Sequence, residues 1–168
     1  MNYLALVAGK IKEIAGLVAS AGAGDAGKIP ALDSNGKLDL SLLPTGIGAD
    51  TKLILASEAI GAGKFVNVYL NASTLNVRLA DASNPAKEAN GFVLEAVDNA
   101  ANATVYFRGT NNEQSGLTVG ATQFLSASTP GNATNTPPST GGQIVQQLGK
   151  STASTEIQVS IEQPIELV

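Results

Sequence analysis

The sequence predicts a mainly β protein, with a small β-barrel or sandwich body that follows an N-terminal helix and an extended arm. From about residue 51 onward, apolar and polar residues alternate with a period of two, which is typical of half-buried strands. Turn-forming residues separate these short runs, as in barrels and sandwiches. The first twenty residues follow a helical spacing instead. We therefore divide the chain into residues 1–20, 21–50 and 51–168.

Residues 1–20 are expected to form an amphipathic helix. Its predicted interface residues recur at spacings of three and four: Leu4, Val7, Ile11, Ile14 and Val18. This spacing is that of a short coiled-coil seam, and the mixed Ile, Val and Leu favour three strands over two. Gly9 and Gly16 each cost such a helix about 1 kcal/mol relative to alanine. The helix therefore needs packing, either on its own domain, on copies of itself or on a partner.

Residues 20–28 are small and glycine-rich, so they are expected to form a flexible joint. Gly22, Gly27 and Lys28 have the spacing of a phosphate-binding loop. However, Ile29 occupies the position of the required Ser or Thr, and Pro30 prevents a normal helix start. The sequence thus argues against nucleotide binding.

Residues 21–50 are expected to be a linker and an extended arm that binds a partner surface. Asp33 to Gly36 form a turn sequence in which Asn35 or Gly36 takes the left-handed conformation. A calcium loop starting at Asp33 would need Glu at its twelfth position, where Pro44 stands. The arm also carries more apolar side chains than its length can bury: Ile29, Leu32, Leu38, Leu40, Leu42 and Leu43. Such side chains are expected to lie against another surface.

The body from residue 51 to 168 is predicted to contain eight strands, at 52–57, 64–70, 74–80, 91–97, 103–109, 122–127, 143–149 and 155–162. Residues 71–73 are a short hairpin link between two of them. The segments 109–116 and 128–142 are predicted to be polar loops, which are often functional or packed on a neighbour. About 115 residues are enough for one real core.

Composition excludes several classes of function. The chain has no cysteine and no histidine, so no thiol nucleophile, zinc knuckle or Ser-His-Asp triad can be built. A net charge of −4 with only Arg78 and Arg108 argues against nucleic-acid binding. Charges at Lys10, Lys12 and Glu13 interrupt the first apolar run, which argues against a signal peptide or membrane span. We expect no cofactor, metal or small-molecule substrate.

An enzyme would have to rely on carboxylates. Glu95 alternates with Val93 and Val97, so it would be a buried acid if that strand face pointed inward. Phe92, Leu94 and Ala96 offer the better core face, and no paired carboxylates are apparent in the spacing. The sequence therefore predicts a protein without enzymatic activity, although a carboxylate-based hydrolase stays open as a third hypothesis.

Two parts of the chain resemble virion proteins of tailed bacteriophages. Residues 27–44, GKIPALDSNGKLDLSLLP, resemble a linker shared by tail fibres and head-decoration proteins. A series of ordered segments is similar to a small β module of capsid cement proteins and some fibres: 62–69, 78–83, 87–93, 104–110, 116–120, 124–126, 129–131, 137–138 and 145–149. Together the two cover about residues 27–168.

The resemblance implies a tulip-like β body and a homotrimer on the outer surface of the capsid, bound to the major capsid protein. It equally fits a module of a trimeric tail fibre or spike that contacts a host surface. Because the chain starts with Met and ends just after its last predicted strand, we expect a decoration protein that stabilises the shell. The family has no catalytic motif, so no catalytic residue follows from the resemblance.

Overall fold

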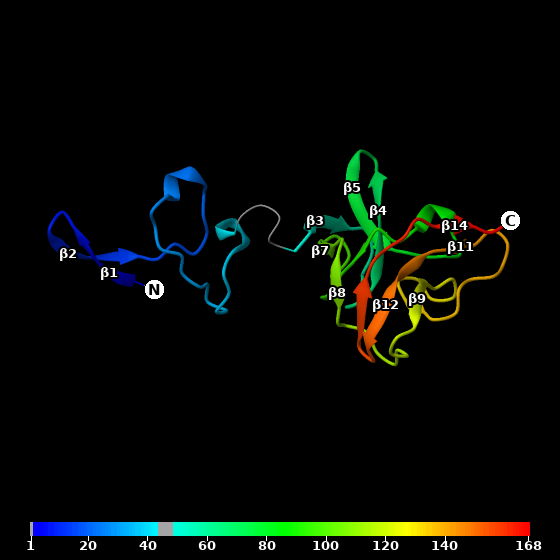
Figure 1. Cartoon of the computed structure of the whole chain (residues 1–168). Coiled ribbons are helices and arrows are strands. Elements are labelled where there is room, and N and C mark those ends of the chain that lie inside the picture. The colour runs from blue at the N-terminus through cyan, green and yellow to red at the C-terminus, as the bar shows by residue number, and fades with distance from the viewer. Residues whose placement is uncertain (1, 44–48) are drawn as a thin grey trace. The chain divides into compact units, whose positions relative to one another are not determined.

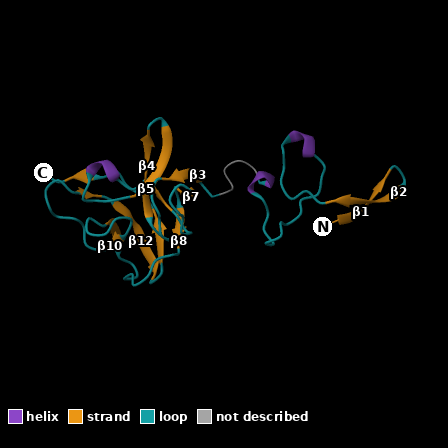
Figure 2. Cartoon of the chain, turned by 180° about the vertical axis from the view of Figure 1, so that it is seen from behind, coloured by secondary structure: helices purple, strands orange, loops and turns teal. Residues whose placement is uncertain are grey.

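The structure is a computed structural model that describes residues 2–43 and 49–168 (Figure 1). Its contacts divide the chain into a first unit, residues 1–48, and a body, residues 49–168. Among the described residues the helical elements are three short 3-10 turns: η1 (Ala23–Asp25), η2 (Leu40–Leu42) and η3 (Pro85–Lys87). All other regular structure in Figure 2 is β-strand.

The first unit begins with a β-hairpin, so the helix predicted for residues 1–20 is wrong. Strands β1 (Asn2–Val7) and β2 (Lys10–Ala15) pair antiparallel, with Val7 opposite Lys10. Ala8 and Gly9 between them have φ values of 51° and 76°, the left-handed pair of a tight type I′ turn. Gly9 would destabilise a helix, but it adopts the positive φ of this turn without strain. The β-branched and aromatic residues on either side favour strands.

The rest of the first unit is held by local hydrogen bonds. Leu17 pairs with residues 29–31, because its N–H donates to the Ile29 carbonyl and its carbonyl accepts from the Ala31 N–H. Residues 18–28, which include the predicted flexible joint at 20–28, are thereby closed into a loop. The predicted turn at Asp33 is confirmed: the Asp33 carboxylate accepts from Asn35 and Lys37 N–H groups, and Gly36 has φ 73°.

The body contains a closed barrel, which confirms the mainly β class. Its strands follow the order β3 (Thr51–Ala56), β5 (Thr74–Leu79), β4 (Phe65–Asn71), β6 (Gly91–Phe92) and β7 (Asn102–Tyr106). Among the described strand pairs of the barrel, β3 and β5 run parallel and the others run antiparallel. Small and β-branched side chains dominate the barrel core: Ile54, Ala56, Ile60, Val66, Val77, Val93, Ala103 and Val105.

A five-stranded sheet completes the body. Its order is β10 (Ala133–Thr134), β9 (Thr122–Leu125), β12 (Gln147–Ala153), β13 (Glu156–Val159) and β8 (Gly109–Asn111). A two-stranded sheet pairs β11 (Ile144–Val145) with β14 (Ile165–Glu166). A second core joins this sheet to the barrel: Phe65, Ala80, Ala82, Ala89, Phe92, Leu125, Ile144, Leu148, Ile157 and Val159. The Phe92 ring stacks on Tyr106 with centroids 5.5 Å apart.

Several predicted strands are shorter than expected. The run 91–97 is a strand only at β6, and Val97 adds an isolated bridge to Ile60. The predicted loops 109–116 and 128–142 contain the short strands β8 and β10. The hairpin link at 71–73 is confirmed, with Asn71 opposite Thr74.

Candidate functional site

The first candidate surface is the exposed face of the N-terminal hairpin. Leu4, Leu6 and Ile11 share one face of β1 and β2 and are 73%, 74% and 74% exposed. Among the described residues of the first unit, Ala31 is the one hydrophobic residue in the buried class. A two-stranded hairpin is marginally stable alone, so an apolar face of this kind favours contact with another surface.

The residues predicted to form the helix interface do not lie on one face in the structure. Leu4 and Ile11 lie on one face of the hairpin, whereas Val7 and Ile14 lie on the other. Val18 lies beyond both strands. Sequence reasoning missed Leu6, although its spacing of two from Leu4 is the signal expected of a strand.

The predicted arm residues are mostly exposed. Ile29, Leu32, Leu38 and Leu43 are in the exposed class, and Leu42 is half-buried. The side chain of Leu40 lies outside the described part of the chain. The described residues 29–43 that carry them form turns, extended segments and η2, and contain no strand.

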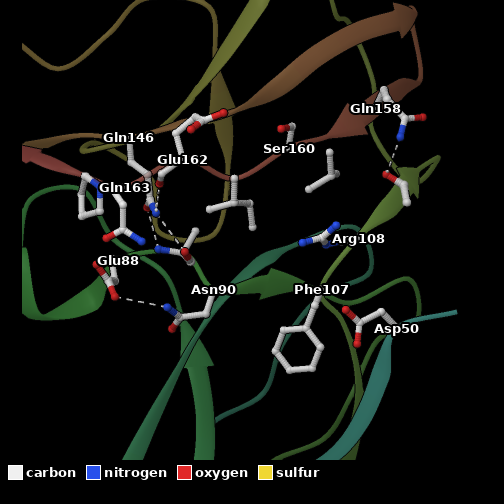
Figure 3. A pocket seen from close by; sticks show the side chains of 15 residues that line it. Asp50, Glu88, Asn90, Phe107, Arg108, Gln146, Gln158, Ser160, Glu162 and Gln163 are labelled. Carbon is white, nitrogen blue, oxygen red and sulfur yellow. Dashed lines mark hydrogen bonds between the residues drawn. The ribbon is translucent and has the colours of Figure 1, made fainter. Parts of the chain in front are cut away.

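The second candidate site is an open cleft of about 710 Å³ in the body (Figure 3). One wall is β13 and its continuation to Pro164. The other wall holds the corner at Phe107 and Arg108 and the segment 88–90. The sequence analysis did not predict this cleft, because its walls come from segments far apart in the chain.

Gln146 forms the back of the cleft and is 2% exposed. Its Oε1 accepts from the Ala89 N–H at 2.7 Å, and its Nε2 donates to the Ala89 carbonyl at 2.9 Å. The same Nε2 donates to the Glu162 carbonyl at 3.1 Å. Gln146 thus holds the two walls at a fixed separation by satisfying their backbone groups.

The mouth of the cleft carries polar groups that are available to a ligand. Asp50, Arg108, Glu162 and Gln163 line it, and in the described ranges their side chains make no hydrogen bond or ion pair. Figure 3 shows Arg108 and Asp50 toward one end of the cleft, and Glu162, Gln163 and Glu88 toward the other end. Glu88 accepts a hydrogen bond from Asn90 at 3.3 Å.

A smaller groove of about 290 Å³ lies beside the outer face of β7 and includes Glu95 and Asp98. Glu95, the candidate acid of the sequence analysis, is exposed there. The burial that the candidate-acid hypothesis required is therefore not found at Glu95.

The aspartates of the first unit serve local structure. The Lys28 ammonium, 2.5 Å from the Asp25 carboxylate, and the Ala21 N–H lower the pKa of Asp25 below its ordinary value. Hydrogen bonds from Lys37 and Asn35 lower the pKa of Asp33, and those from Ser41 lower the pKa of Asp39. Residues 2–43 and 49–168 contain no group of three or more acidic side chains placed to hold a metal ion.

In the same ranges, no helix has the length and apolar character needed to cross a membrane. No protein-family model matches the chain, and the search of curated proteins found no significant match. The assignment of a function therefore depends on the surfaces described above and on the sequence resemblance.

Proposed function

We propose that this protein is a structural component of a tailed-phage virion, which decorates the outer surface of the capsid as a trimer and bridges neighbouring capsid subunits. The resemblance of residues 27–168 to head-decoration proteins motivates the proposal. The observation that carries it is the apolar surface of the first unit, above all Leu4, Leu6 and Ile11.

Covering that surface is a large source of binding free energy. Fully burying a Leu or Ile side chain contributes about 1.5–3 kcal/mol. Three such residues on a small hairpin, with Ile29 and Leu32 further along the chain, can attach a subunit at one point. A trimer would present three copies, so the first attachment raises the effective concentration of the others.

The two units would then have separate roles. The first unit docks on the major capsid protein, and the barrel body stays outside the shell. Bridging contacts raise the free energy needed to separate capsid subunits. In this proposal the work of the protein is mechanical, and the polar cleft of the body is not a catalytic site.

The test compares two full-length triple variants on purified shells that lack decoration. Leu4→Ser, Leu6→Ser and Ile11→Ser remove the exposed apolar face of the hairpin. Leu53→Ser, Leu70→Ser and Val119→Ser are the matched control, because these body residues are also 63–69% exposed. Cosedimentation measures the number of copies bound to each shell, and light scattering measures the molar mass of the free oligomer.

The first variant is expected to lose at least about tenfold in affinity, since about 1.4 kcal/mol gives a factor of ten. The control is expected to bind as the parent does. Full binding by the first variant would overturn the role of the hairpin. If the parent binds host cells and no shell, the tail-fibre function replaces the proposal.

A further inference from the structure

The cleft of the body lies where the five-stranded sheet lacks a strand. β8 begins at Gly109, which pairs with Val159, and the preceding Arg108 belongs to the corner that follows β7. The chain after β13 nevertheless continues along β12. The Ser160 N–H donates to the Leu148 carbonyl at 2.9 Å, and the Glu162 N–H donates to the Gln147 carbonyl at 3.0 Å.

The other edge of this continuation faces the cleft. In an extended strand, successive residues direct their N–H and C=O groups to opposite sides. Because Ser160 and Glu162 point to β12, Ile161 and Gln163 point to the cleft that they line. Within the described part of the chain, no hydrogen bond involves the backbone groups of either residue. An open edge of this kind is a template for another strand.

Charge and shape indicate what kind of strand fits. Asp50, Glu88 and Glu162 line the cleft with a single basic group, Arg108, so its ionised side chains sum to −2. Phe107 and Ile161 are half-buried and add apolar surface. A segment that alternates basic and apolar residues matches both features, because its side chains point alternately to the two faces.

We propose that the cleft binds an extended basic segment of a partner protein, added as a strand beside residues 160–163 in the position that β8 leaves open. Backbone hydrogen bonds to Ile161 and Gln163 supply affinity, and the three carboxylates select Lys or Arg. This site belongs to the body alone. Its test is therefore independent of capsid attachment through the first unit.

The probe is the peptide acetyl-Lys-Val-Lys-Val-Lys-amide, titrated into full-length protein labelled with ¹⁵N. We expect shifted and more slowly exchanging amides at Ile161 and Gln163, with weaker binding at high salt. The same peptide N-methylated at every residue cannot donate backbone hydrogen bonds and is expected not to bind. The peptide acetyl-Glu-Val-Glu-Val-Glu-amide tests the charge preference and is also expected not to bind.

Two protein variants test the geometry. Ile161→Pro removes one N–H from the open edge and is expected to weaken peptide binding about fivefold or more. Asp50→Asn with Glu162→Gln keeps the shape of two exposed side chains and is expected to weaken binding at least as much. Glu95→Gln with Asp98→Asn makes the same charge change outside the cleft and should leave binding unchanged.

The proposal fails if the basic peptide leaves the Ile161 and Gln163 amides unmoved at about millimolar concentration. It also fails if the acidic or N-methylated peptide binds equally well. If Ile161→Pro proves unfolded by its NMR spectrum, the paired Asp50 and Glu162 variant decides alone: unchanged affinity rejects the proposal, and a loss supports it.

Discussion

The guanidinium carbon of Arg78 lies 4.1 Å from the centroid of the Tyr69 ring, on the β4–β5 hairpin of the barrel. The same guanidinium donates from Nε to the Asn67 Oδ1 at 2.9 Å and from Nη2 to the Ala86 carbonyl at 3.0 Å. Asn67 is buried and in turn donates to the Glu88 carbonyl at 2.8 Å. Arg78 therefore connects the hairpin to the segment that forms one wall of the cleft.

Replacing Arg78 by alanine is expected to lower the free energy of unfolding by about 2–3 kcal/mol. The change leaves the buried Asn67 oxygen without its donor and removes a cation–π contact. Lysine at the same position keeps the charge but not the forked geometry, so it is expected to recover only part of the loss. Urea denaturation measures each value. The control Arg108→Ala is expected to stay within about 0.5 kcal/mol, because Arg108 is exposed and makes no such contact with any residue that the structure describes.

Gln146→Ala is expected to destabilise the body by about 2–4 kcal/mol. It removes the side chain that satisfies both backbone groups of Ala89, in a buried position where each lost partner costs about 1–3 kcal/mol. The neighbouring Gln147→Ala is the control, since Gln147 is exposed. Thermal unfolding of the two variants should differ clearly, and equal midpoints would contradict the role assigned to Gln146.

The strand faces of the body could be predicted because alternation there has one physical cause. Val66 lies opposite Leu79, and Val68 lies opposite Val77, so these four residues share the barrel-core face that the period of two predicts. The prediction was less accurate after Phe92, where β6 ends although Val93 is buried. Phe65 and Val66 also enter different cores, yet they lie inside β4, so burial on both faces does not mark a strand end.

The N-terminal segment shows a second limit. Apolar spacings of three and four fit a helix seam, but four of the five seam residues lie in two strands joined at Ala8 and Gly9. A two-residue turn with positive φ values joins the two strands, and the spacing of two between Leu4 and Leu6 is the sign of a strand in the sequence. The cleft could not be predicted for a different reason. From the sequence, Gln146 looks like an ordinary polar residue, and only the structure shows that its side chain is hydrogen-bonded to Ala89.

The loop of residues 18–28 is expected to respond to acid. Its Asp25 carboxylate has a lowered pKa because Lys28 and the Ala21 N–H bind the charged form. The stabilisation is therefore fully present above the ordinary pKa of aspartate and is lost as the pH falls through the lowered one. The Ala21 amide shift, followed by NMR from neutral to acid pH, should report this transition.

The Asp25→Asn variant provides the control for that titration. It cannot ionise, so its Ala21 amide should show no transition in the acid range. A parent transition at or above the ordinary aspartate pKa would contradict the assigned hydrogen bonds. High salt is expected to weaken the effect only in part, because the contact with Ala21 is a hydrogen bond to a neutral group.

Gly63 is expected to tolerate no side chain. It has φ 73°, and an added Cβ would lie 2.2 Å from the Glu113 carbonyl oxygen. Its own carbonyl accepts from Asn111 at 2.8 Å and from Gln114 at 2.6 Å, so the backbone cannot move away without breaking both bonds. Gly63→Ala should therefore cost more than about 3 kcal/mol, from overpacking together with lost buried hydrogen bonds.

A control at Gly116 distinguishes the cost of the steric contact from the cost of the left-handed backbone conformation. It has a similar φ of 68°, but an added Cβ would meet no atom within 4 Å. Gly116→Ala is therefore expected to cost only the left-handed penalty of about 1–2 kcal/mol. Urea denaturation of both variants measures the difference. Equal losses would mean that the close approach of Gly63 to Glu113 does not constrain the fold, whereas a larger loss at Gly63 assigns the excess to that contact.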